Sequence, residues 1–168
     1  MRSFLWCSLF LVSSCAPVRP AEDPGRAVQV ENMLFELCPR ALSGALDLSD
    51  PGQLEQHGLV PAEREAGWIY ARTAAGSGEL LIGFQQFTNN SVCRLRFEGA
   101  DNQAIVRHLL RTGAARGWRS SAGPGELGGF IAFLLPPGAQ NRRIMFVHHP
   151  AHRDLPASSS AGMILDRP

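Results

Sequence analysis

The chain has 168 residues, and its 16 basic residues, all of them arginine, nearly balance 15 acidic residues to leave a formal net charge of +1. This balance gives no electrostatic argument for a nucleic-acid partner or for anionic lipid. Because the chain contains no lysine, it cannot use a Schiff base, a phosphate-loop lysine or a Ser-Lys dyad. The length suits one domain with a substantial core.

Residues 1–14 have the pattern of a signal peptide. Arg2 supplies a positive charge, and residues 4–12 form an apolar run that only Ser8 interrupts. The run has the length of a signal-peptide core and is too short to span a bilayer, which needs roughly 20 apolar residues.

The segment Val12-Ser13-Ser14-Cys15 resembles the lipobox of bacterial lipoproteins. The resemblance implies that Cys15 is lipidated and becomes the mature N-terminus, so that lipid attaches the protein to a membrane. Ala16, in the next position, implies the outer membrane, facing the periplasm. The alternative is an ordinary signal peptide cleaved after Ala16, which would release the protein into the periplasm and make Cys15 incidental.

Residues 15–27 predict an extended tether, because they lack apolar periodicity and are rich in proline and glycine. The breaking residues are Pro17, Pro20, Pro24 and Gly25. Residues 28–168 are then expected to form a single domain.

Cys38 and Cys93 remain once Cys7 leaves with the signal peptide and Cys15 carries lipid. An even pair of cysteines in an oxidising compartment favours a disulfide. Strand alternation places Cys93 on the apolar side of its strand, so both thiols are expected to face one core. Two buried free thiols are the alternative.

The apolar spacing predicts helices over residues 28–37, 42–46, 51–57, 61–65 and 101–115. Pro39 should stop or kink the first helix at Cys38. Asp50 and Asp101 are placed to cap their helices. The last helix either ends early at Gly113, which weakens its final turn, or continues until Gly117 follows its end.

Alternation and turn residues predict strands over residues 68–72, 79–87, 91–97, 118–121, 128–135, 142–149 and 161–165. The short links between them indicate antiparallel pairing. We therefore expect an α+β fold, with N-terminal helices packed on a mainly antiparallel sheet and one further helix between two groups of strands. Helix followed by strands occurs twice, without an internal repeat in the residues themselves.

The order of several residues resembles that in small envelope proteins of proteobacteria. These residues are Phe35, Cys38, Gly67, Trp68, Cys93, Gly117 and Trp118. The resemblance covers part of the chain and implies no particular activity.

The segment around His148 contains the residue types that bind metals, namely His148, His149, His152 and Asp154. On a strand, His148 and His149 point to opposite faces and cannot share an ion. A site from His148 with His152 or Asp154 across a turn is possible, but zinc needs three or four ligands. We expect an exposed strand end here, with no metal and no cofactor.

Two further motifs are weaker. Residues 123–128 match the letters of a dinucleotide-binding loop, but a strand pattern follows where that motif needs a helix, so a hairpin turn is expected. Ser158, Ser159 and Ser160 could supply a nucleophile to a histidine base. No nucleophile elbow surrounds them, and a loop is expected.

Arg94 and Arg96 share one strand face and, if near Arg107 or Arg111, could form an anion-binding patch. A solvated sheet face is the simpler interpretation of the same pattern.

Together these patterns predict a lipid-anchored periplasmic domain with a non-catalytic binding, accessory or structural role. An immunity-type inhibitor of a periplasmic toxin would be one form of it. The expected partners are the membrane, through the anchor, and an envelope protein, with no nucleic acid. The alternative is a metal-dependent or Ser-His hydrolase of the periplasm.

Overall fold

A single eight-stranded antiparallel sheet dominates the computed structural model, which describes residues 24–62, 64–74, 80–98, 102–124, 129–138, 141–150 and 158–166. The strands are β1 (Leu59–Pro61), β2 (Ile69–Thr73), β3 (Leu80–Gln86), β4 (Asn90–Glu98), β5 (Arg119–Pro124), β6 (Phe130–Leu135), β7 (Arg142–His149) and β8 (Ser158–Asp166). The helices are α1 (Pro24–Asn32), the π-helical turn η1 (Met33–Leu37), α2 (Cys38–Leu42), α3 (Pro51–Glu55) and α4 (Asn102–Ala115). The mixed α+β class agrees with the prediction, and the sheet is the larger part.

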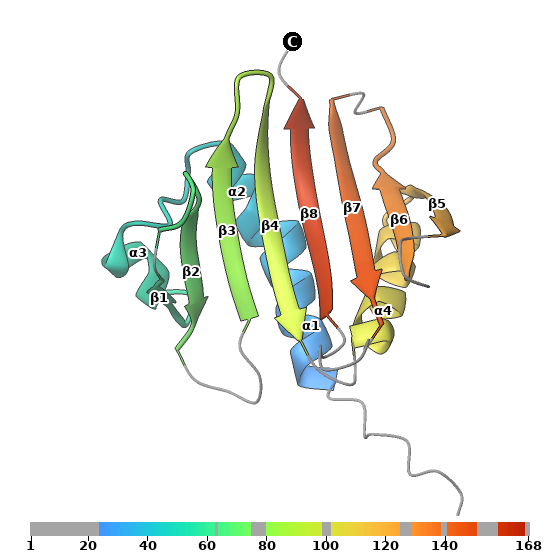
Figure 1. The fold of residues 1–168 in the computed structure, drawn as a ribbon, viewed down its shortest axis with the longest axis horizontal. Coiled ribbons are helices and arrows are strands. Elements are labelled where there is room, and N and C mark those ends of the chain that lie inside the picture. The colour runs from blue at the N-terminus through green and yellow to red at the C-terminus, as the bar shows by residue number, and fades with distance from the viewer. Residues whose placement is uncertain are drawn as a thin grey trace, which may run out of the picture.

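The sheet is built from two meanders that meet at its centre. Strands β1 to β4 form one, strands β5 to β8 the other, and the strand order is β1-β2-β3-β4-β8-β7-β6-β5 (Figure 1). Strands β4 and β8 pair antiparallel over their whole length, from Asn90 opposite Asp166 to Glu98 opposite Ser158. Each meander follows a helical segment in the chain.

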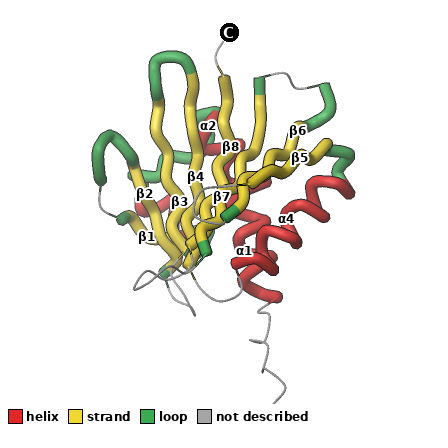
Figure 2. The backbone as a smooth tube through the Cα atoms, turned by 45° about the vertical axis from the view of Figure 1, so that its right-hand side comes forward, coloured by secondary structure: helices red, strands yellow, loops and turns green. Residues whose placement is uncertain are grey.

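The helices α1, α2 and α4 all lie on one side of the sheet (Figures 1 and 2). We call this side the helix face. No element that the structure describes covers the other side, which we call the open face. The helix face carries the core, because the fully buried side chains of β3, β4, β7 and β8 alternate toward it.

The first helix begins at Pro24, and residues 24–27 are therefore helical and not part of a tether as the sequence suggested. Proline is favoured at the first turn of a helix, where its missing N–H costs nothing. Arg26 is buried, and Ala27 packs against the core. Tertiary contacts thus extend a helix that apolar periodicity alone starts at Val28.

Pro39 does not stop this helix at Cys38, which was one of the two outcomes predicted, but the type of helix changes there. The turn before it is π-helical, and the N–H of Cys38 bonds to the carbonyl of Met33, five residues earlier. Proline cannot donate to the carbonyl four residues before it, and its ring crowds that group. The wider π turn lies just before Pro39, and the helical segment continues past Pro39 to Leu42.

The region after this helix differs from the predicted pattern in two places. Residues 43–46 form a turn instead of a helix, because Gly44 takes a positive φ of 76° and the N–H of Ala45 bonds back to Arg40. Residues 59–61 form β1 at the sheet edge, although the sequence predicted no strand there and a helix from residue 61. The predicted cap at Asp50 is confirmed, since its side chain accepts from the N–H of Gly52 at 2.9 Å.

Helix α4 ends as predicted, with Gly117 at a φ of 76° just beyond it. Its cap position, Asp101, lies outside the described residues. Gly113 allows α4 to approach β6 closely, because a Cβ there would lie 2.6 Å from a methyl carbon of Leu134. A glycine that weakens the helix locally is therefore required by packing.

Cys38 and Cys93, the pair expected from the cysteine count, form a disulfide. It joins α2 on the helix face to β4 at the centre of the sheet. Both residues are fully buried. The bond links positions 55 residues apart in the chain.

Candidate functional site

The two adjacent histidines of the segment with metal-binding residue types lie on opposite faces of the sheet, as strand alternation predicted. His148 points to the helix face and is only 6% exposed, so the expectation of an exposed strand end is wrong for this residue, whereas His149 is exposed and points to the open face. His152 and Asp154 lie outside the described residues. Among the residues that are described, no group of three or more His, Cys, Asp or Glu side chains could hold a metal.

His148 forms a buried pair with Ser159. Its Nδ1 lies 2.8 Å from the Ser159 hydroxyl, which is on a residue only 4% exposed. Burial lowers the pKa of His148 below its ordinary value, and the neighbouring His149 lowers it further. The serine run is not the expected loop: it opens β8, and this strand places Ser159 opposite His148.

The structure describes little of the remaining sequence motifs. Gly123 and Pro124 are exposed at the end of β5, and the rest of the glycine motif lies outside the described residues, as does Cys15. Of the helices described, none has both the length and the apolar character needed to cross a membrane.

The open face carries an apolar patch over β6, β7 and β8. Its members are Ile131, Phe133, Leu135, Met145, Val147 and Ile164, all partly exposed. Cross-strand pairing makes the centre of the patch continuous, with Phe133 opposite Met145 and Ile131 opposite Val147. At its margins Leu135 is opposite Arg119 and Ile164 is opposite Arg143. Contiguous apolar side chains on an exposed sheet face mark interaction surfaces.

The open face is also rich in arginine. Alternation and pairing place Arg72, Arg94, Arg96, Arg119 and Arg143 on it. Two acidic residues lie on the same face. Asp166 forms an ion pair with Arg143, and Glu98 is opposite Ser158 in the register at the end of β4. The face is therefore basic, although the whole chain is almost neutral.

A pocket of about 260 Å³ lies where β4 and β7 end and β8 begins. We call it the arginine pocket. It is lined by Arg94, Arg96, Phe97, His149, Ser158, Ser159 and Ser160. In Figure 1 these strand ends lie at the lower edge of the sheet. The pocket thus combines residues from both meanders.

Arg94 is held in place by two aromatic side chains of the first meander. It donates a hydrogen bond from Nη2 to the Tyr70 hydroxyl at 2.9 Å, and its guanidinium lies 4.4 Å from the centre of the Trp68 ring. Trp68 and Tyr70 stack on each other. The Tyr70 ring in turn occupies the space over Gly83, where a Cβ would collide with it.

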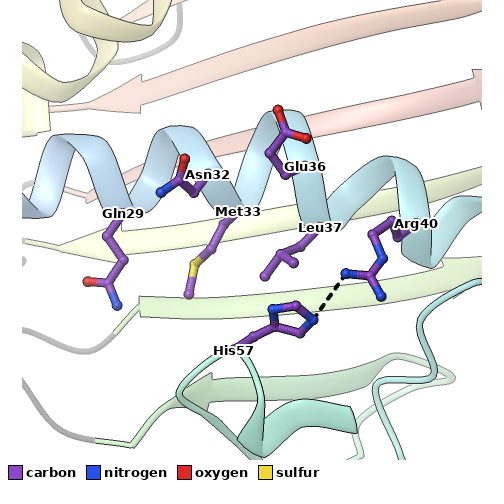
Figure 3. A pocket seen from close by; sticks show the side chains of 7 residues that line it. All are labelled: Gln29, Asn32, Met33, Glu36, Leu37, Arg40 and His57. Atoms are coloured by element: carbon purple, nitrogen blue, oxygen red, sulfur yellow. Dashed lines mark hydrogen bonds between the residues drawn. The ribbon is translucent and has the colours of Figure 1, made fainter.

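A second cavity, of about 360 Å³, lies along the helices, and we call it the helix groove (Figure 3). Met33 and Leu37 point into it from η1, and Gln29 and Arg40 flank them on the neighbouring turns. Arg40 donates to Nε2 of His57 at 3.1 Å across the groove. Side chains three and four residues apart share one helix side, which explains this alignment.

Comparison of the chain with protein-family models, with curated proteins and with solved structures found no match. The chemistry of these surfaces therefore has to indicate the function.

Sequence reasoning identified part of the arginine pocket but assigned it the wrong neighbours. Arg107 and Arg111 lie on α4, which covers the helix face, and so they are separated from Arg94 and Arg96 by the sheet. The true neighbours come from β7 and β8. Alternation reveals that two residues share a strand face, but it cannot reveal which distant strand pairs beside them.

Proposed function

We propose that this chain is a lipid-anchored domain of the bacterial envelope that binds an anionic partner through the open face of its sheet, without catalysis. The anchor rests on the lipobox resemblance that ends at Cys15. The observation that carries the binding role is the composition of the open face, where the apolar patch lies beside arginines and no described element covers either.

Physical chemistry supports a binding role for such a face. Partly exposed apolar side chains gain free energy when a partner removes them from water, at about 25 cal/mol per Å² of buried apolar surface. Arginine and aromatic side chains are enriched at the centres of protein interfaces. An excess of guanidinium groups on the same face favours a partner of negative charge.

A photo-crosslinking amino acid at position 133, inside the apolar patch, tests this proposal in intact cells with the full chain. The matched control is position 28 on α1, where Val28 is 48% exposed. Adducts should form from position 133 and be lost when Arg96→Glu and Arg119→Glu reverse two charges of the open face. Equal adduct yields from both positions, or yields that ignore the charge reversal, would contradict the proposal.

A second candidate is a Ser-His hydrolase, which the hydrogen bond between His148 and Ser159 favours. A nucleophilic serine next to an uncharged imidazole is the arrangement that such enzymes use. The burial of both side chains opposes it, because a substrate carbonyl must reach the hydroxyl.

A fluorophosphonate probe applied to the native full chain separates the two candidates. The binding role predicts no labelling. Covalent labelling that disappears in Ser159→Ala would establish the hydrolase instead.

A further inference from the structure

We infer that the arginine pocket is a binding site for a phosphate-type oxyanion. This inference rests on the proposed function, because it names the chemistry that the open face would recognise. It is carried by four features of the pocket: its donors, its uncompensated charge, its prearranged Arg94 and its shape.

The side chains lining the pocket are suited to donate hydrogen bonds to an anion. Arg94 and Arg96 contribute guanidinium groups, which match phosphate oxygens with two parallel donors each. Ser158 and Ser160 add hydroxyls, and His149 adds an imidazole. No carboxylate is among the described residues that line this pocket.

The charge of the two arginines is not compensated within the part of the chain that the structure describes. Neither Arg94 nor Arg96 has a carboxylate at ion-pair distance there. The Nε of Arg94 is buried and has no hydrogen-bond acceptor among the residues that are described. A partly desolvated cation without a counter-ion is costly, and a bound anion would offset that cost.

Arg94 is arranged before any ligand arrives. The Tyr70 hydroxyl and the Trp68 ring fix its guanidinium from the side of β2, as described above. On the other side its cross-strand partner is Gly162, so no β8 side chain stands directly opposite Arg94. A group that is already ordered loses less entropy on binding, which favours affinity.

The spacing of the donors suits a compact anion with several oxygens. Arg94 and Arg96 are two residues apart on one strand, so their Cα atoms are separated by about 7 Å and their side chains point the same way. Ser160 lies directly opposite Arg96 on β8. A phosphate group is small enough for a pocket of about 260 Å³. The phosphate could belong to a lipid headgroup or be free in solution.

The test uses the full chain carrying Cys15→Ala, so that no lipid anchor contributes to binding. Inorganic phosphate is titrated at constant ionic strength, and binding is followed by calorimetry and by the NMR signal of the Arg94 Nε–H. We expect saturable binding to one site that shifts this signal. Arg96→Gln should weaken it by about tenfold or more, as the loss of one charge-assisted hydrogen bond implies.

Arg119→Gln is the matched control, because it removes the same charge from the open face at β5, away from the pocket, and should leave phosphate affinity unchanged. Arg96 is exposed and has no side-chain partner among the described residues, so Arg96→Gln should fold normally, and its melting curve checks this. Absence of saturable phosphate binding, or an equal loss in both variants, would overturn the inference.

Vesicles distinguish the two sources of phosphate. Binding to phosphatidylglycerol vesicles over phosphatidylcholine vesicles, with competition by inorganic phosphate and loss in Arg96→Gln, would support a lipid headgroup. Phosphate binding without preference between the vesicles would support a soluble phosphate. If phosphate does not bind but crosslinking still depends on the open face, the oxyanion site fails and the proposed function stands. The reverse result would reject the proposed function alone.

Discussion

His148 and His149 are adjacent in the chain and experience opposite environments. His148 packs in the core and bonds to Ser159, whereas His149 faces water at the arginine pocket. Because burial disfavours the charged imidazole, the pKa of His148 is lowered in the folded state. A group with a lowered folded-state pKa contributes stability at high pH that is lost as the pH falls.

The pH dependence of stability tests this difference. The unfolded-state pKa of histidine is about 6.5, so neutral His148 stabilises the fold above that pH, and this contribution disappears as the pH falls through the lower folded-state pKa. Between about pH 7 and pH 5, the free energy of unfolding should decrease more in the wild type than in His148→Asn. Denaturant unfolding at several pH values measures it.

His149→Asn is the control for this measurement. It leaves the buried imidazole in place, so the free energy of unfolding should change with pH almost as steeply as in the wild type. If the free energy of unfolding of His148→Asn changes with pH as steeply as that of the wild type, burial of His148 does not cause the loss of stability at low pH.

At the scale of elements, α1 and α4 are joined by a polar network centred on Glu31. Its carboxylate lies 2.6 Å from Nε2 of His108, accepts from the Thr112 hydroxyl at 3.2 Å and lies 3.5 Å from Arg116. The guanidinium of Arg116 also stacks over Phe35. This network fixes how the two helices lie on the sheet.

Glu31→Gln should lower the free energy of unfolding by about 1 kcal/mol, since the partly buried carboxylate loses its charge while keeping one acceptor. The matched variant is Glu36→Gln. Glu36 is mostly exposed and makes a single contact with Arg116 at 3.7 Å, so its change should stay within about 0.5 kcal/mol. Equal effects in chemical denaturation would show that Glu31 is not the centre of the network.

The disulfide connects the helical layer to the central strand β4. Its removal in Cys38→Ala with Cys93→Ala should lower the free energy of unfolding by about 2–4 kcal/mol, mainly because the unfolded chain gains freedom. A reducing agent should destabilise the wild type by a similar amount and leave the double variant unchanged. If the melting temperature of the wild type does not change when the disulfide is reduced, the predicted stabilisation by the disulfide is contradicted.

For the whole molecule, the decisive property is the distribution of charge. The net charge of +1 gave no argument for an anionic partner. The fold distributes the charges unevenly, because arginines outnumber carboxylates on the open face, whereas most described carboxylates lie on or near the helices beside arginines such as Arg116, among them Glu31, Glu36, Asp50 and Glu55. A partner that binds one face interacts mainly with the charged side chains of that face, so the net charge of the whole chain does not predict the partner.

In the proposed function, membrane attachment depends on one residue, Cys15. In a Gram-negative host, the full chain should incorporate labelled fatty acid and partition into detergent, and Cys15→Ala should abolish both, because the thiol is the site of lipidation in the proposed function. Cys7→Ala is the matched control and should keep the label. Label that persists in Cys15→Ala would reject the anchor.

Most elements could be predicted from the sequence because their signals are local. Alternation located β3, β4 and β7, and spacing with a following glycine located α4 and its end. The predictions were wrong where contacts between distant residues determine the structure. Strand β1 was missed because it forms by pairing with β2, and the helix start at Pro24 was missed because it depends on packing. Pro39 does not stop the helix, which was one of the two predicted outcomes, because the preceding π turn accommodates it inside a longer helical segment.

The sequence by itself determined the class of fold, the disulfide pair and the opposite directions of His148 and His149, since periodicity and composition act over short distances in the chain. Only the tertiary structure decided which residues surround Arg94 and Arg96. The antiparallel pairing of β4 with β8, and of β8 with β7, brings His149, Ser158 and Ser160 beside them. Those pairings join segments that are far apart in the chain. The local sequence pattern cannot predict them, because any exposed strand edge offers the same backbone hydrogen bonds.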